Sequence, residues 1–155
     1  HVDCLRALHE LGAAASLSAA AAGGLTPAHD AASEGHVDCL RALHELGAAA
    51  SLSAAAANGR TPAHYAALKG HVDCLRALHE LGAAASLSAA AANGRTPAHY
   101  AASEGHAVCL RALHELGAAA SLSAAAADGG TPAHDAAVNG HADCLRALHE
   151  LGAAA

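Results

Sequence analysis

The chain contains no phenylalanine, tryptophan or methionine, and only two of its 155 residues are tyrosine. A core built without aromatic rings has to be filled by leucine, alanine, cysteine and a few valines. No window holds eighteen bulky apolar residues in a row, which excludes an ordinary membrane-spanning helix. No basic segment precedes an apolar stretch at the start, so we expect no secretory signal peptide in these residues.

Positive charge is also scarce. Eight Lys and Arg residues face fourteen Asp and Glu residues, which gives a net charge of −6 with the histidines neutral. Binding to nucleic acid depends largely on Lys and Arg at the phosphates, so an acidic chain is a poor candidate for it. We therefore expect a protein partner and no nucleic acid.

The residues that are present follow one repeat. TPAH begins at residues 26, 61, 96 and 131, and the segment CLRALHELG recurs with the same spacing of 35. A period of 20–50 residues is typical of a solenoid, in which each unit buries its apolar face on the next. We predict a single array over residues 1–155. It divides into a partial unit (1–25), three full units (26–60, 61–95 and 96–130) and a second partial unit (131–155).

Each unit is predicted to contain two helices and a loop. Thr61 caps a short helix over Ala63–Leu68, and Pro62 suits its first position because no hydrogen bond is lost there. Gly70 ends this helix in the left-handed conformation. A second helix is predicted over Val72–Leu81, since its apolar residues recur at steps of three and four. The following alanine-rich segment is predicted to be a loop that ends in an Asn-Gly turn.

These features resemble the ankyrin repeat family over essentially the whole chain. The matching residues are TPAH, the AAxxG of the first helix, the GH before the second helix, and the closing LGA. The resemblance implies an all-α solenoid of stacked helix-turn-helix repeats with alanine-rich loops. Two departures are a period of 35 instead of about 33, and alanine where the family carries an Asp before the loop glycine (Ala56, Ala91 and Ala126). The loop tips are therefore expected to be less rigid than usual.

Fourteen histidines and five cysteines invite a metal hypothesis, but their spacing disfavours it. Cys4, Cys39, Cys74, Cys109 and Cys144 recur one per unit, and the resemblance implies units on the order of 10 Å apart. That distance exceeds both the limit of about 7 Å for a disulfide and the span of one zinc site. We expect buried, reduced thiols, no metal and no cofactor, and a reducing intracellular compartment, cytoplasmic or nuclear.

The sequence offers no catalytic constellation. The HELGA segment lacks the second histidine of a zinc-protease helix, and no nucleophile elbow, Walker or dinucleotide motif occurs. The TPAH histidines (His29, His64, His99 and His134) are expected to bond to the capping threonine or nearby backbone and to tie adjacent units together. The resemblance implies the same role. We expect a non-catalytic chain.

The units differ from one another at a few slots, which the resemblance places on the concave face. The central units carry the residues that we predict to contact a partner: Arg60, Tyr65, Leu68, Lys69, Arg95, Tyr100, Ser103 and Glu104. Tyr and Arg are enriched at binding hot spots, so both tyrosines are predicted to be anchors for a segment carrying an acid beside an apolar residue. The alternatives are neutral drift at exposed positions, a structural spacer or subunit of a larger assembly, and a designed or consensus scaffold without a natural ligand.

Overall fold

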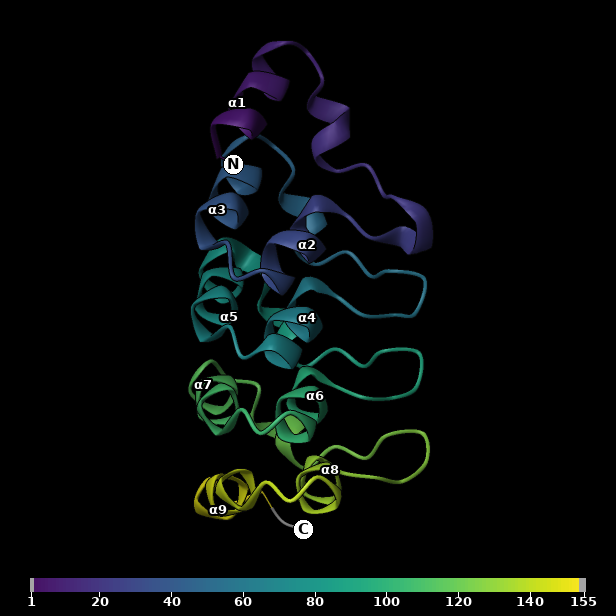
Figure 1. Ribbon diagram of the computed structural model, residues 1–155, viewed down its shortest axis with the longest axis vertical. Coiled ribbons are helices and arrows are strands. Elements are labelled where there is room, and N and C mark those ends of the chain that lie inside the picture. The colour runs from purple at the N-terminus through teal and green to yellow at the C-terminus, as the bar shows by residue number, and fades with distance from the viewer. Residues whose placement is uncertain (1, 154–155) are drawn as a thin grey trace.

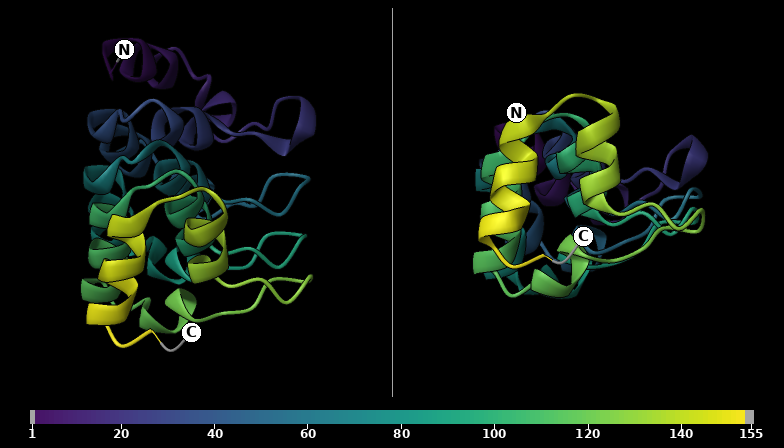
Figure 2. Two further views of the ribbon diagram at one scale, coloured as in Figure 1. Left: turned by 60° about the horizontal axis from the view of Figure 1, so that its bottom comes forward. Right: turned by 90° about the horizontal axis from the view of Figure 1, so that it is seen from below.

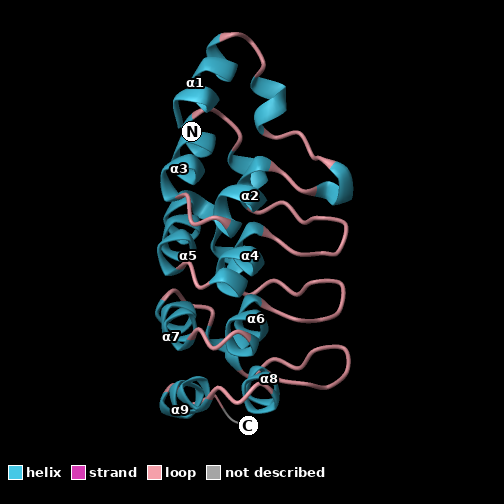
Figure 3. Ribbon diagram, in the orientation of Figure 1, coloured by secondary structure: helices cyan, strands magenta, loops and turns pink. Residues whose placement is uncertain are grey.

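The computed structural model describes residues 2–153, which form a column of stacked helix pairs without any strand (Figures 1 and 3). The outer helices are α1 (Val2–Glu10), α3 (Val37–Glu45), α5 (Val72–Leu78), α7 (Ala107–Glu115) and α9 (Ala142–Glu150). The inner helices are α2 (Pro27–Ser33), α4 (Pro62–Lys69), α6 (Pro97–Ser103) and α8 (Pro132–Val138). Inner helices stack on inner helices and outer on outer, and each inner helix also packs on the outer helix that follows it. The all-α prediction is confirmed.

The inner helices begin and end for the reasons expected. In α4, Thr61 and His64 form a reciprocal capping pair, and Pro62 occupies the first helical turn. Gly70 ends the helix at φ +79°, a left-handed conformation that other residues adopt only at a cost. Three of its alanines, Ala63, Ala66 and Ala67, are 0% exposed, and their small size lets neighbouring inner helices approach closely.

The alanine-rich segment was predicted to be a loop, and this is wrong for its first half in the first four units and also for its end in the first unit. Short 3₁₀ turns cover Ala14–Leu17, Ala22–Gly24, Ala49–Leu52, Ala84–Leu87 and Ala119–Leu122. In the central unit the Ser86 hydroxyl donates to the Ala83 carbonyl at 2.7 Å, and Leu87 is fully buried in the core. The second helix also ends earlier than predicted, at Leu78, where a π turn (His79–Ala83) leads into the 3₁₀ turn. One buried leucine thus fixes a segment whose other side chains are almost all alanine or serine.

Some ion pairs on the outer helices join different units, whereas Arg6–Asp3 and Arg146–Asp143 lie within one helix. Arg41 pairs with Glu80 at 2.9 Å, and the same bond recurs one period later between Arg76 and Glu115 at 3.0 Å. Arg41 also has Asp38 and Glu45 on its own helix, three and four residues away, but its guanidinium pairs with neither. The 35-residue step places the next unit's glutamate within reach of the arginine. These side chains are about half exposed, so each pair contributes at most about 1 kcal/mol.

Candidate protein-binding face

A buried imidazole joins each complete inner helix to the next unit. The Nδ1 atom of His64 accepts the Thr61 backbone N–H at 3.0 Å, and its Nε2 atom lies 3.2 Å from the Arg95 carbonyl. A carbonyl can only accept, so Nε2 carries the proton and the ring is neutral. His29 and His99 make the same bonds to the carbonyls of Arg60 and Gly130. The linking role predicted for these three histidines is confirmed, whereas His134 bonds to Thr131 within its own unit and is exposed.

A second histidine bonds to the preceding unit in three of the units, whereas the capping histidine bonds to the residue just before the next unit. His71 bonds to the Ser33 carbonyl at 3.0 Å, and His106 bonds to the Leu68 carbonyl at 3.2 Å. Each ring lies against the glycine that ends the preceding inner helix. A Cβ added to Gly70 would stand 2.8 Å from the His106 ring, and Gly70 also has a positive φ, so only glycine fits there. These contacts fix the carboxyl ends of the inner helices.

The loop tips project from one side of the column and touch one another (Figure 2). The Ala92 N–H donates to the Asn58 carbonyl at 3.0 Å, and the same bond joins Ala127 to Asn93. A Cβ on Gly59 would lie 2.5 Å from the Ala92 nitrogen, so the tips can approach this closely only at glycine. Although the described residues contain no strand, each tip is therefore held by its neighbour.

Arginine and tyrosine side chains fill the space between the loop tips and the inner helices, and we call this surface the tip face. The Arg60 Nε–H donates to the Tyr100 hydroxyl at 3.1 Å, and the guanidinium carbon lies 4.4 Å from the ring centroid. Asn93 also donates to this hydroxyl, at 3.4 Å. Tyr100 is only 4% exposed. The expectation that Tyr100 offers an accessible contact is therefore wrong, because Arg60 and the tip cover it, and Tyr100 instead supports Arg60.

Tyr65 occupies the same slot one unit earlier and is only partly buried. Its ring packs edge-to-face with the His29 ring, with the two centroids 5.7 Å apart and the planes at 84°. Asn58 donates to its hydroxyl at 3.5 Å, and the Arg60 guanidinium carbon lies 5.9 Å from its centroid. The two tyrosines thus differ in access although their immediate sequences match.

Arg95 differs from Arg60 in its partner. Its guanidinium forms an ion pair with Asp135 of α8, and the two side chains are 30% and 17% exposed. Among residues 2–153, no carboxylate pairs with Arg60. Sequence reasoning missed this distinction. Each arginine and its partner are 40 residues apart, which is one period plus five. Comparing residues at this separation would have paired Arg60 with a tyrosine and Arg95 with an aspartate.

The eight predicted contact residues fall into two groups. Arg60, Tyr65, Arg95 and Tyr100 lie together on the tip face. The others lie at the carboxyl ends of α4 and α6, where Leu68 and Ser103 are partly buried and Lys69 and Glu104 are exposed. Among residues 2–153, neither a side-chain hydrogen bond nor an ion pair joins the two groups.

Similarity to known proteins supports the same architecture. The family model for ankyrin repeats, which spans three copies, matches residues 1–89 and again 81–154. The chain belongs to the ankyrin repeat family. A search of curated proteins found no match to it. Ankyrin repeats are in general modules for protein–protein interaction, and the resemblance inferred from TPAH and GH is confirmed.

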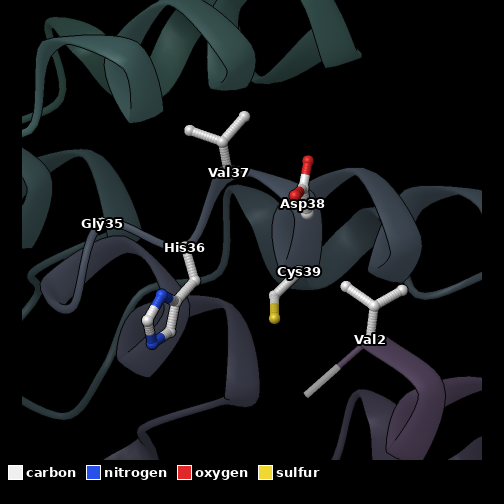
Figure 4. A pocket seen from close by; sticks show the side chains of 6 residues that line it. All are labelled: Val2, Gly35, His36, Val37, Asp38 and Cys39. Carbon is white, nitrogen blue, oxygen red and sulfur yellow. The ribbon is translucent and has the colours of Figure 1, made fainter.

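One pocket of the ankyrin array lies away from the tip face. It has a volume of about 360 Å³ and is lined by Val2 and by residues 35–39 (Figure 4). His36 lines this pocket, whereas its counterpart one unit later, His71, packs against Gly35. The pocket is thus part of the stacking surface at the amino-terminal end of the column.

Two further classes of site find no support in the part of the chain that the structure describes. No group of three or more His, Cys, Asp or Glu residues between residues 2 and 153 is placed to hold a metal ion. None of the helices described is both long and apolar enough to cross a bilayer.

The cysteines are arranged unequally along the array. Cys39, Cys74, Cys109 and Cys144 are buried, as expected, whereas Cys4 is exposed, which corrects the expectation for the first unit. Burial raises the pKa of the Cys109 thiol to about 12, and that of Cys74 to about 11. A thiolate is the reactive form, so the buried thiols are poor nucleophiles.

We expect Cys109 to react with a thiol probe roughly a hundredfold or more slowly than Cys4 in the folded protein. A rise in pKa from 9.0 to about 12 lowers the thiolate fraction about a thousandfold, and burial restricts access further. Timed alkylation followed by peptide mass spectrometry measures both rates, and denaturation should make them equal. Rapid labelling of Cys109 in the folded state would contradict its placement in the core.

Proposed function

We propose that this ankyrin repeat array binds a protein partner through the tip face and catalyses no reaction. The observation that carries the proposal is the cluster of Arg60, Tyr65 and Tyr100, in which an arginine and a partly exposed tyrosine are held in place by buried neighbours. A contact surface that is already ordered loses less side-chain entropy on binding. The net charge of −6 favours protein over nucleic acid as the partner.

The wider surface includes the second group, Leu68, Lys69, Ser103 and Glu104, at the carboxyl ends of the inner helices. We propose that the whole chain, residues 1–155, acts as one array with the unit boundaries given above. The partner segment that fits is one with an apolar residue to cover the Tyr65 ring and an acid for the arginines. Buried thiols without a disulfide support an intracellular, reducing setting for this interaction.

Peptides selected from a displayed random library provide a direct test. Tyr65→Ala is expected to weaken binding of the selected peptides about tenfold or more, because it removes exposed aromatic surface at the centre of the face. Its melting temperature should change little. Tyr100→Ala is unsuitable for this purpose, because truncating a residue that is 4% exposed leaves a cavity.

The matched control is Val108→Ala on outer helix α7. Val108 is 66% exposed and lies on the opposite helix layer, so its truncation should leave peptide affinity unchanged. Isothermal titration calorimetry of both variants with the same peptide decides the matter. Peptides that depend on Val108 and are indifferent to Tyr65 would place the binding surface on the outer helices.

A further inference from the structure

We infer that Arg60 is the position that receives a carboxylate from the partner, and that Arg95 is closed to it because Asp135 already fills the corresponding place. The inference rests on the proposed function and adds to it which arginine makes the contact. It also assigns Tyr100 as a positioning residue for Arg60.

The array contains two copies of the same arginine position. Each arginine follows a loop tip and reaches a residue 40 positions later, in the first turn of the next unit's inner helix. Arg95 meets the carboxylate of Asp135 there, whereas Arg60 meets the hydroxyl of Tyr100. The Arg95–Asp135 pair thus shows that an arginine at this position binds a carboxylate. The chain supplies a carboxylate to Arg95 and none to Arg60.

The Arg60 guanidinium is held without being neutralised. Its Nε–H donates to the Tyr100 hydroxyl at 3.1 Å, and its guanidinium carbon lies over the Tyr100 ring, 4.4 Å from the centroid. Asn93 fixes the hydroxyl in turn. Within residues 2–153, neither an ion pair nor a hydrogen bond engages the terminal nitrogens of Arg60, which leaves a two-pronged donor for a carboxylate.

No carboxylate of residues 2–153 forms an ion pair with Arg60 at this position. The neighbouring imidazole of His64 is neutral, and the positive charge of Arg60 helps to keep its pKa low, secondary to burial. Tyr65, partly exposed on the same face, offers an aromatic surface 5.9 Å from the guanidinium carbon. The occupant is therefore a protein segment that carries Asp or Glu next to an apolar side chain.

A double-mutant cycle with the selected peptides tests this assignment. The probe is a peptide that binds the wild-type array and contains one acid, compared with the same peptide carrying the corresponding amide. Arg60→Gln should weaken the acidic peptide at least tenfold and the amide peptide hardly at all. Arg76→Gln, on outer helix α5 and paired with Glu115, should show no such coupling.

A second variant keeps the Arg60 guanidinium and occupies it with a carboxylate from the chain itself. Tyr100→Asp places on α6 the residue that α8 carries naturally, so it should give Arg60 an internal partner as Arg95 has. Loss of the buried ring should lower stability, so affinity is measured on protein shown to be folded by circular dichroism, and we expect a loss of at least tenfold for the acidic peptide. Tyr100→Asn, which removes the aromatic ring without adding charge, should lose less.

The outcomes separate the two proposals. Peptides that depend on Tyr65 but carry no enriched acid, or show no coupling with Arg60, would overturn this inference and leave the proposed function standing. Coupling with Arg95 in place of Arg60 would also overturn it. Peptides that bind elsewhere, or a selection that yields none, would overturn the proposed function and this inference together.

Discussion

Leu78→Ala is expected to lower the free energy of unfolding by about 2–5 kcal/mol. Leu78 is 0% exposed in a central unit and lies in a core of leucine and alanine, packed between neighbouring units on both sides. Small neighbours cannot expand to fill the space left by an isobutyl group, so a cavity would remain. Urea denaturation monitored by circular dichroism measures the change.

The first unit provides a matched control for this mutation. Leu8 occupies the same slot within the same CLRALHEL segment, yet it is 41% exposed. Leu8→Ala removes the same atoms from a partly solvated site and should cost well under half as much. Equal losses at Leu8 and Leu78 would contradict the assignment of the central units as the buried core.

Local signals sufficed to predict the helical frame. Thr61 and Pro62 start a helix through hydrogen bonding and a fixed φ, and Gly70 ends it through a left-handed conformation. These causes act within a few residues and can be recognised in any single unit. The 35-residue period then requires the units to stack, since one unit alone cannot bury its apolar face.

Contacts between units were less accessible to sequence reasoning. Arg41 has two acids on its own helix, yet it pairs with Glu80, because the stacking distance places the next unit's side chain within reach. Leu87 draws an alanine-rich segment into a 3₁₀ turn through a core contact that local propensity does not reveal. Both outcomes depend on the separation and rotation of neighbouring units, which the period alone does not specify.

The tip face shows the same limit at the candidate site. Comparison of the units grouped Arg60, Tyr65, Arg95 and Tyr100, and these side chains lie together in the structure. It did not reveal that Tyr100 is covered whereas Tyr65 is not. The difference arises because residue 60 is an arginine and residue 25, one unit earlier, is a leucine. Access to one slot is therefore set by a residue 40 positions away.

Acid is expected to destabilise the array as the pH falls from 6.5 toward about 4. Burial lowers the pKa of His64 from 6.5 to about 4, against a smaller opposing effect of its bond to the Arg95 carbonyl. Burial also lowers the pKa values of His29 and His99. Below pH 6.5 these histidines bind protons in the unfolded chain but remain neutral in the folded chain, so protonation favours unfolding.

The sign and size of the change in unfolding free energy with pH follow from the difference in histidine pKa between the folded and unfolded chain. Stability from these histidines is fully present above pH 6.5, declines between 6.5 and about 4, and levels off below. For His64 alone the depressed pKa corresponds to about 3 kcal/mol over that range. His29 and His99 add to the loss in the same direction. Unfolding free energies from urea titrations between pH 7 and 5 avoid most of the range in which carboxylates titrate.

The slope with pH, and not the stability at one pH, identifies the cause. His64→Gln removes one titrating group and should flatten the slope by about 1.4 kcal/mol per pH unit within the window, whatever it does to the baseline. His79→Gln alters an exposed histidine on the π turn and is the comparison variant: the slope should change less in it than in His64→Gln. The protonated His64 would have to present an N–H to the Thr61 N–H that it now accepts, which would disrupt the cap of α4. If the wild-type array keeps its full stability at pH 5, this imidazole does not link the units as a neutral ring.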